Sequence, residues 1–277
     1  MRPKSLFLIL PLCGILAPTL ANAGDPAALT RFLAEGTCVQ CDLRYESFAR
    51  RSLRGSVLTA AYLFNADFSR CDLSDAELES AVLTHADLKR ADLARANLAK
   101  ANLQEADLYG ATLRGANLTF AQLDGATLEA AELTQATLTT ASLTEANLTD
   151  AFASEAKMRS ADLSRANLSR IDLTNADLEG SRLAGTRLTA ANLSGAHMPR
   201  ANFDAADLTG ARIVYTNLRQ ASFRNARLVD AVIDGANLRQ ADFSGADLTG
   251  AKFSSVSDAE ANYCGATLPD GRRGACR

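Results

Sequence analysis

The chain has 277 residues, of which 47% are hydrophobic and only 6% aromatic, and it contains no tryptophan. Large aromatic side chains usually supply much of a globular core, so this composition argues against a conventional globular fold. The formal net charge is -3, from 29 basic and 32 acidic residues. A mildly acidic chain of this kind indicates neither a nucleic-acid binder nor a polyanion.

The N-terminal residues 1–23 have the organisation of a secretory signal peptide. Arg2 and Lys4 precede an apolar run over 6–16, and 21–23 read Ala-Asn-Ala, a small-residue cleavage site. The run is shorter than the roughly 20 residues that a spanning helix needs, and no other segment of the sequence is apolar enough to span a bilayer. We therefore expect an exported protein, periplasmic or secreted, whose formal net charge becomes -5 when this segment is removed.

Cysteine usage fits an exported chain. Cys13 follows the bulky Leu12, which argues against lipid attachment at that cysteine. Five cysteines would remain after cleavage: Cys38, Cys41, Cys71, Cys264 and Cys276. In an oxidising compartment they can form disulfides, and an odd number means that at least one thiol stays free or pairs between chains.

A short helix is predicted directly after the cleavage site. Asp25 is a favourable helix N-cap, Pro26 suits the first helical position, and Gly36 follows an apolar stripe as a stop signal. These signals predict a helix over 26–35 within an N-terminal cap of residues 24–40.

The rest of the chain repeats every five residues. From Leu43 to Phe253 all 43 central positions are apolar; 32 are Leu, and only one is the small Ala153. Two positions earlier, Ala stands in 34 of the 43 repeats. A period of five fits neither a helix nor a strand, so a turn must reset the side-chain direction once per repeat. This self-similarity predicts a solenoid in which the Ala and Leu side chains point inward.

The pattern A-(D/N)-L-x-x resembles the pentapeptide-repeat family over about residues 41–268. The resemblance implies an all-β solenoid, a right-handed quadrilateral β-helix with four pentapeptides per coil. About 43 repeats would then form about 11 coils, a rod about 50 Å long at the usual strand spacing. We place the β-helix at 41–257 and a C-terminal cap at 258–277, because Asp258 interrupts the apolar register.

Several residues differ from the repeat pattern, and each leads to a further prediction. Three Ala-type positions of the first coil hold larger or polar residues: Glu46, Arg51 and Ser56. They predict a loose or open first coil. At Ala153 we expect a local kink or an exposed Phe152, with an inward turn of Phe152 as the alternative. Ile171 at an Ala-type position predicts an overfilled layer and a bulge in the wall.

The motif Cys38-Val-Gln-Cys41 admits two interpretations, a thiol-redox or half-zinc site and a structural disulfide. Redox chemistry would need a helix N-terminus to lower the thiol pKa, and zinc would need a second ligand pair. Neither is visible, and Cys-x-x-Cys followed by Asp-Leu also resembles the start of some exported pentapeptide-repeat proteins, which favours the disulfide. Cys264 and Cys276 flank a turn and are expected to bridge the C-terminal cap. Cys71, at an Ala-type position, is expected to be a small buried hydrophobe.

No catalytic, cofactor-binding or metal-binding residue is predicted. The only histidines, His85 and His197, fall in outward positions on different faces. Tyr45, Tyr62 and Phe64 form the best candidate for an exposed interaction patch, with sealing of the cap as the alternative.

Charge is uneven along the sequence. The segment 115–156, here called the acidic belt, contains no Lys or Arg, whereas arginines dominate from Lys157 onward. This asymmetry either steers a protein partner or is drift among solvent-facing residues.

We therefore expect a non-catalytic, exported interaction or scaffold rod with an unknown protein partner, monomeric or weakly dimeric. Family resemblance offers one alternative, a DNA mimic that interacts with a topoisomerase. The Cys-x-x-Cys motif offers another, a thiol-redox protein. The export signal and the arginine-rich C-terminal half argue against the DNA mimic.

Overall fold

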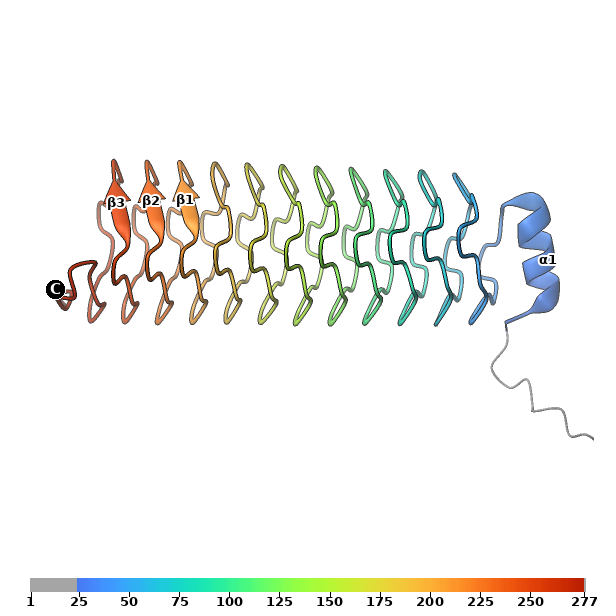
Figure 1. Ribbon diagram of the computed structural model, residues 1–277, viewed down its shortest axis with the longest axis horizontal. Helices are drawn as coiled ribbons and strands as arrows, with labels where there is room; N and C mark the ends of the chain where they lie inside the picture. Colours follow the sequence, from blue (N-terminus) through green and yellow to red (C-terminus); the bar gives the residue numbers. More distant parts are fainter. Residues whose placement is uncertain (1–23, 277) are drawn as a thin grey trace, which may run out of the picture.

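The computed structural model describes residues 24–276, so the predicted signal peptide lies outside the described residues. Figure 1 shows a straight stack of coils with a helix at one end and the C-terminal tail at the other. The elements are helix α1 (Pro26–Glu35) and the short strands β1 (Arg212–Val214), β2 (Val232–Asp234) and β3 (Lys252–Ser254). The three strands lie in consecutive coils and pair in parallel.

Each coil contains 20 residues, or four pentapeptides. Parallel bridges join residues 20 apart in sequence, from Thr37 with Val57 at one end to Asp247 with Thr267 at the other. Pentapeptides with equivalent positions therefore stack into four columns. We name them the Leu43, Phe48, Leu53 and Leu58 columns after the central residues of the first coil, so that β1, β2 and β3 belong to the Leu53 column.

In each pentapeptide, one residue has a left-handed backbone conformation, and the chain turns there. The residue before each Ala-type position has a positive φ, as at Arg95 (58°) and Gly115 (64°). Glycine adopts this conformation freely, whereas other residues pay about 1 kcal/mol or more. Hydrogen bonds between coils offset this cost, for example from Arg95 N to Arg114 O at 2.9 Å. The turn that was expected once per repeat is thus present whether or not the residue is glycine.

Two kinds of side-chain stack fill the interior, one made of Leu and Ala and one made of aromatic rings. Central Leu and preceding Ala side chains are buried throughout the middle of the stack. Near the C-terminal end, the stacked rings of Phe203, Phe223 and Phe243 in the Leu43 column have centroids 4.8 Å apart, and Tyr263 continues the stack at 5.2 Å. This spacing is that of neighbouring strands, so each ring contacts the ring of the next coil.

Helix α1 covers the N-terminal end of the stack (Figure 1). The Asp25 side chain accepts a hydrogen bond from Ala27 N at 2.9 Å, and Gly36 ends the helix with a φ of 69°. The Phe32 ring is buried edge-on against Phe48, with ring centroids 5.6 Å apart. The helix therefore buries apolar surface of the first coil that would otherwise face water.

The coiled backbone continues beyond residue 257, where the apolar pattern ends. Asn262 N still donates to Ala241 O at 2.9 Å although Asp258 is exposed. Backbone hydrogen bonds between coils do not require an apolar side chain at every centre, so the ladder extends to Thr267. Beyond it the chain turns back, and Thr267 pairs with Arg273 in antiparallel orientation.

The bulge predicted at Ile171 and the kink predicted at Ala153 are wrong, whereas the exposed Phe152, the other expectation at Ala153, is confirmed. Both side chains are buried, and the bonds Asp172 N to Ala151 O (3.0 Å) and Ala153 N to Asp172 O (2.7 Å) keep the regular ladder geometry. The two residues lie in adjacent coils of the Leu53 column, and we infer that the extra volume of isoleucine fills the space left by the missing leucine. Phe152 points outward and is 54% exposed.

Candidate functional site

The Cys-x-x-Cys motif is a buried disulfide. Cys38 and Cys41 are bonded to each other with their Cα atoms 5.6 Å apart. They follow Gly36, the C-cap of α1, and a helix C-terminus carries partial negative charge. That charge disfavours a thiolate, whereas a redox-active cysteine needs the positive N-terminus of a helix. The environment therefore fits a structural bridge better than a thiol-redox or zinc site.

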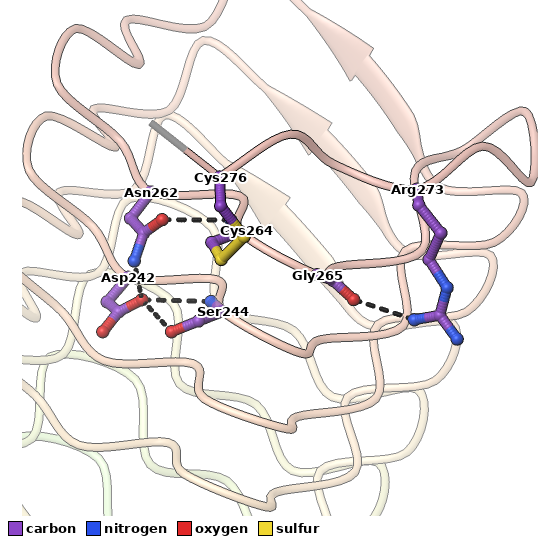
Figure 2. Close-up of a disulfide and its surroundings, with 7 residues drawn as sticks. All are labelled: Asp242, Ser244, Asn262, Cys264, Gly265, Arg273 and Cys276. Atoms are coloured by element: carbon purple, nitrogen blue, oxygen red, sulfur yellow. Dashed lines mark hydrogen bonds between the residues drawn. A yellow bond between two sulfur atoms is a disulfide. The ribbon is translucent and has the colours of Figure 1, made fainter.

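A second disulfide ties the C-terminal tail to the last coil. Cys264 and Cys276 are bonded with Cα atoms 4.3 Å apart. As Figure 2 shows, Cys264 N donates to Asn262 Oδ1 at 3.0 Å, and Asn262 Nδ2 donates to Asp242 Oδ1 in the coil beneath at 3.0 Å. The bridge is thus anchored through polar contacts to the regular part of the rod.

The remaining described cysteine, Cys71, is a free and buried thiol. Burial raises the pKa of Cys71 to about 12, and only the thiolate form reacts with alkylating reagents. We expect the mature protein, beginning at Gly24, to incorporate no N-ethylmaleimide at pH 8 when folded and oxidised, and one equivalent after unfolding without reductant, as measured by intact mass. Rapid labelling of the folded protein would show that the interior opens at Cys71.

The structure brings two members of the predicted aromatic patch, Tyr45 and Phe64, into contact. Tyr45, Tyr62 and Phe64 all belong to the Leu43 column, and the rings of Tyr45 and Phe64 meet edge to face at 5.5 Å. Phe64 also contacts the His85 ring at 5.4 Å. Tyr45 is 43% and Tyr62 51% exposed, whereas Phe64 is half-buried. The patch is therefore a surface feature, rather than part of the buried contact with α1.

The structure also contains a cluster around His197 that was not predicted from the sequence. Asp177, Glu179 and His197 have ligand atoms within 4.8 Å of one another. Asp177 and His197 are 20 residues apart, which is one coil, so this spacing could have revealed the cluster from the sequence. Arg159 lies 2.5 Å from Asp177 Oδ2 and 3.1 Å from Glu179 Oε2, and Arg200 also pairs with Glu179. Because both carboxylates already face guanidinium groups, the arrangement is an ion-pair network and a poor cation site.

The acidic belt is partly neutralised by arginines one coil away. Arg170 forms two contacts of 2.6 Å with the Asp150 carboxylate, and Arg165 lies 2.8 Å from Glu145. The hydrogen bonds from Arg170 hold the pKa of Asp150 below its usual value. The asymmetry seen along the sequence is therefore weaker on the folded surface, since acids of the belt pair with bases of the arginine-rich segment.

Comparison with known proteins identifies the class. A family model of pentapeptide repeats matches the chain in eight copies that together cover residues 41–257. The chain therefore belongs to the pentapeptide-repeat family, whose fold is a right-handed β-helix and whose members are generally non-enzymatic structural or interaction proteins. No curated protein matches the chain. Within residues 24–276, no helix is long and apolar enough to cross a membrane.

Several solved structures resemble this one. HetL, a pentapeptide-repeat protein involved in heterocyst differentiation regulation in the cyanobacterium Nostoc sp. strain PCC 7120, is 30% identical over 89% of this chain and 98% of its own, with a TM-score of 0.39. QnrB1, a plasmid-mediated fluoroquinolone resistance protein, is 19% identical over 76% of this chain and 90% of its own, with a TM-score of 0.32. A thylakoid-lumen protein of Arabidopsis thaliana is 29% identical over 50% of this chain and 68% of its own, with a TM-score of 0.13.

Proposed function

We propose that the protein is an exported, non-catalytic scaffold rod that binds a protein partner along its side. The observation that carries this proposal is the continuous ladder of bridges from Thr37 to Thr267. Such a ladder keeps outward side chains at fixed intervals, while the inward positions are committed to packing. We further propose that the four columns form the four sides of a quadrilateral cross-section, with the positive-φ residues at its corners.

Export is part of the proposal. The organisation of residues 1–23 supports cleavage after Ala23, and the two disulfides support an oxidising compartment such as the periplasm or the extracellular space. We propose a monomer or weak dimer, because α1 covers one end of the stack and the disulfide-bonded tail folds back on the other.

We place the partner contact at the patch of Tyr45, Tyr62 and Phe64. Exposed tyrosines are enriched at the energetic centres of protein interfaces, because they bury a large apolar area at a small entropic cost. The edge contact between Tyr45 and Phe64 also holds one side of the patch in a defined orientation.

In-cell crosslinking of the natively exported protein, followed by mass spectrometry of the adducts and of its own N-terminus, tests this proposal. We expect a mature chain that begins at Gly24 and one dominant envelope or extracellular protein adduct. The double substitution Tyr45→Ala and Tyr62→Ala should reduce that adduct at least about 10-fold. Tyr215→Ala is the matched control, since Tyr215 is 73% exposed but lies far along the rod.

Two outcomes would contradict the proposal. An intact Met1 with a topoisomerase attached would favour the DNA-mimic alternative, for which the coil-to-coil ion pairs give no support because they neutralise acidic groups. An adduct that the tyrosine substitutions leave unchanged would move the contact to another part of the surface.

The thiol-redox alternative predicts insulin reduction that is lost in Cys38→Ser and Cys41→Ser.

A further inference from the structure

Three arginines occupy the same turn position in consecutive coils. Arg50, Arg70 and Arg90 are the positive-φ residues of their pentapeptides in the Phe48 column, with φ values of 60°, 56° and 55°, and all three are exposed. Each backbone amide donates to the next coil, as from Arg70 N to Lys89 O at 2.8 Å. The backbone therefore holds these residues, here called the arginine row, in line along the rod with a step of about 4.8 Å.

The arginine row lacks the acidic partners that basic residues have at the other turn positions. At five further turn positions the basic side chain forms an ion pair with an acid 20 or 21 residues earlier, in the preceding coil: Arg95, Lys100, Arg165, Arg170 and Arg200. In the part of the chain that the structure describes, no ion pair involves a member of the arginine row, and the residue one coil before Arg70 or Arg90 is another arginine. Like charges one coil apart repel each other. An arrangement that breaks the local rule of a fold without a packing gain is expected at a functional site.

A surface hollow of about 460 Å³ adjoins the arginine row. Besides the three arginines, it is lined by Ser69, Asp87, Lys89 and Tyr109. Lys89 Nζ lies 3.2 Å from Asp87 Oδ2 and 2.9 Å from Asp107 Oδ2, so these carboxylates already neutralise its charge. Tyr109 is 38% exposed. The hollow therefore offers a ligand the charges of the three arginines beside one accessible aromatic ring.

An acidic sugar chain suits this lining better than a nucleic acid does. Phosphates recur about every 3.4 Å along a DNA strand, more densely than the arginines of the row. A single strand also binds by stacking successive bases on aromatic rings, whereas Tyr109 is the one aromatic residue that lines this hollow. A sugar chain with carboxylates combines spaced negative charges, hydroxyl groups and apolar ring faces, and the lining has a matching group for each.

We propose that the arginine row binds a uronate-containing oligosaccharide, a ligand separate from the protein partner proposed above. The uronate carboxylates accept hydrogen bonds from the guanidinium groups of the row, whose planar forks match carboxylates in a bidentate geometry. Ser69 and Asp87 form hydrogen bonds with the sugar hydroxyl groups. The apolar face of one sugar ring lies against Tyr109.

Calorimetric titration of the mature, oxidised protein with hexagalacturonate tests this site. We expect a Kd of about 0.1 mM at low salt, and about 10-fold weaker binding when the salt concentration rises from about 20 mM to about 200 mM. Two comparison ligands should each bind at least about 10-fold more weakly. They are the uncharged maltohexaose and a thymidine oligonucleotide with the same number of charges as hexagalacturonate.

Substitutions in the hollow should weaken hexagalacturonate binding in a graded way. Replacing the whole arginine row with alanine should weaken it at least about 30-fold. Arg70→Lys, which keeps the charge but loses the planar fork, should weaken it at least about 3-fold. Tyr109→Ala should also weaken it about 3-fold, and Tyr109→Phe should leave it unchanged. The triple alanine variant should fold, because alanine occupies the same turn position of this column with a positive φ at Ala130 and Ala190.

The matched control removes three other exposed arginines that also form no ion pair with a described residue: Arg212→Ala, Arg219→Ala and Arg239→Ala. It makes the same change in net charge, and should leave hexagalacturonate binding within about 2-fold. An equal loss of affinity in this control would assign the binding to net charge and overturn the proposal. No binding up to about 10 mM, equal affinity for maltohexaose or for the oligonucleotide, or unchanged affinity in the triple variant of the row would overturn it as well.

Discussion

Replacing Ala153 with leucine will destabilise the rod by about 1–3 kcal/mol, although leucine stands at 32 of the 43 equivalent positions. The reason is local. Ile171 in the next coil of the Leu53 column is fully buried, and the backbone between the two coils keeps hydrogen bonds of 2.7 and 3.0 Å. The regular spacing leaves no room for a leucine and an isoleucine together, so one side chain must leave its preferred rotamer.

Shortening Ile171 should also destabilise the rod, but by leaving a cavity. Ile171→Ala in the natural background leaves a cavity beside Ala153 and should cost about 2–5 kcal/mol. The double variant Ala153→Leu, Ile171→Ala recreates the common repeat and should return close to the stability of the natural protein. The coupling between the two sites, measured by urea unfolding of all four proteins, should therefore exceed about 2 kcal/mol.

The same combination of alanine and isoleucine, introduced at positions 93 and 111, provides the matched control. Leu93→Ala and Ala111→Ile have the same relation in an earlier part of the Leu53 column, and the double variant should be more stable than Leu93→Ala alone. Additive effects at both places would mean that Ile171 does not fill the space beside Ala153, and the compensation argument would then fail.

Loss of the Cys264–Cys276 disulfide will release the C-terminal tail. The bridge has a sequence separation of 12, and closing a loop of this size stabilises the cap by about 3 kcal/mol in the chain-entropy model. Cys264→Ser with Cys276→Ser should therefore speed amide exchange about 100-fold at Leu268 and Gly274. These amides donate to Arg272 O at 2.7 Å and to Ala266 O at 2.8 Å, the bonds that hold the tail.

A change in association should accompany this release. The freed tail uncovers the edge of the last coil, and exposed strand edges pair with other chains. Light scattering should therefore detect dimers or larger species in this variant. Cys38→Ser with Cys41→Ser is the control, since those residues lie at the other end of the stack and should leave exchange at Leu268 unchanged. Unaltered exchange in the Cys264 and Cys276 variant would show that backbone hydrogen bonds hold the tail without the bridge.

The sequence predicts the architecture well because a single periodicity encodes it. Leucine every fifth residue fixes the inward side of each pentapeptide, and Asp25, Pro26 and Gly36 mark a helix that the structure places at Pro26–Glu35. The end of the coils was harder to predict, because Asp258 breaks the apolar pattern while the backbone pairing continues to Thr267. Backbone hydrogen bonds leave no trace in the side-chain pattern.

The contacts on the surface and the local packing of the interior could not be predicted from the sequence alone. Ile171 and Ala153 are separated by 18 positions, so their place in adjacent coils is visible only once the coil length is known. The same holds for the ring stack of Phe203, Phe223 and Phe243, and for the approach of Asp177 to His197. The sequence did mark Arg51 and Ser56 as unusual, but whether such residues clash, face solvent or line a hollow depends on how α1 lies across the first coil.

The 20-residue coil also makes the length of the molecule adjustable in discrete units. Removing one complete coil would shorten the stack by about 4.8 Å and leave every downstream residue in its original column. Removing one pentapeptide would instead shift all downstream residues to the neighbouring column and reorient whatever they bind. Duplication and deletion of gene segments can therefore change the reach of this molecule independently of its orientation, provided that they occur in multiples of four repeats.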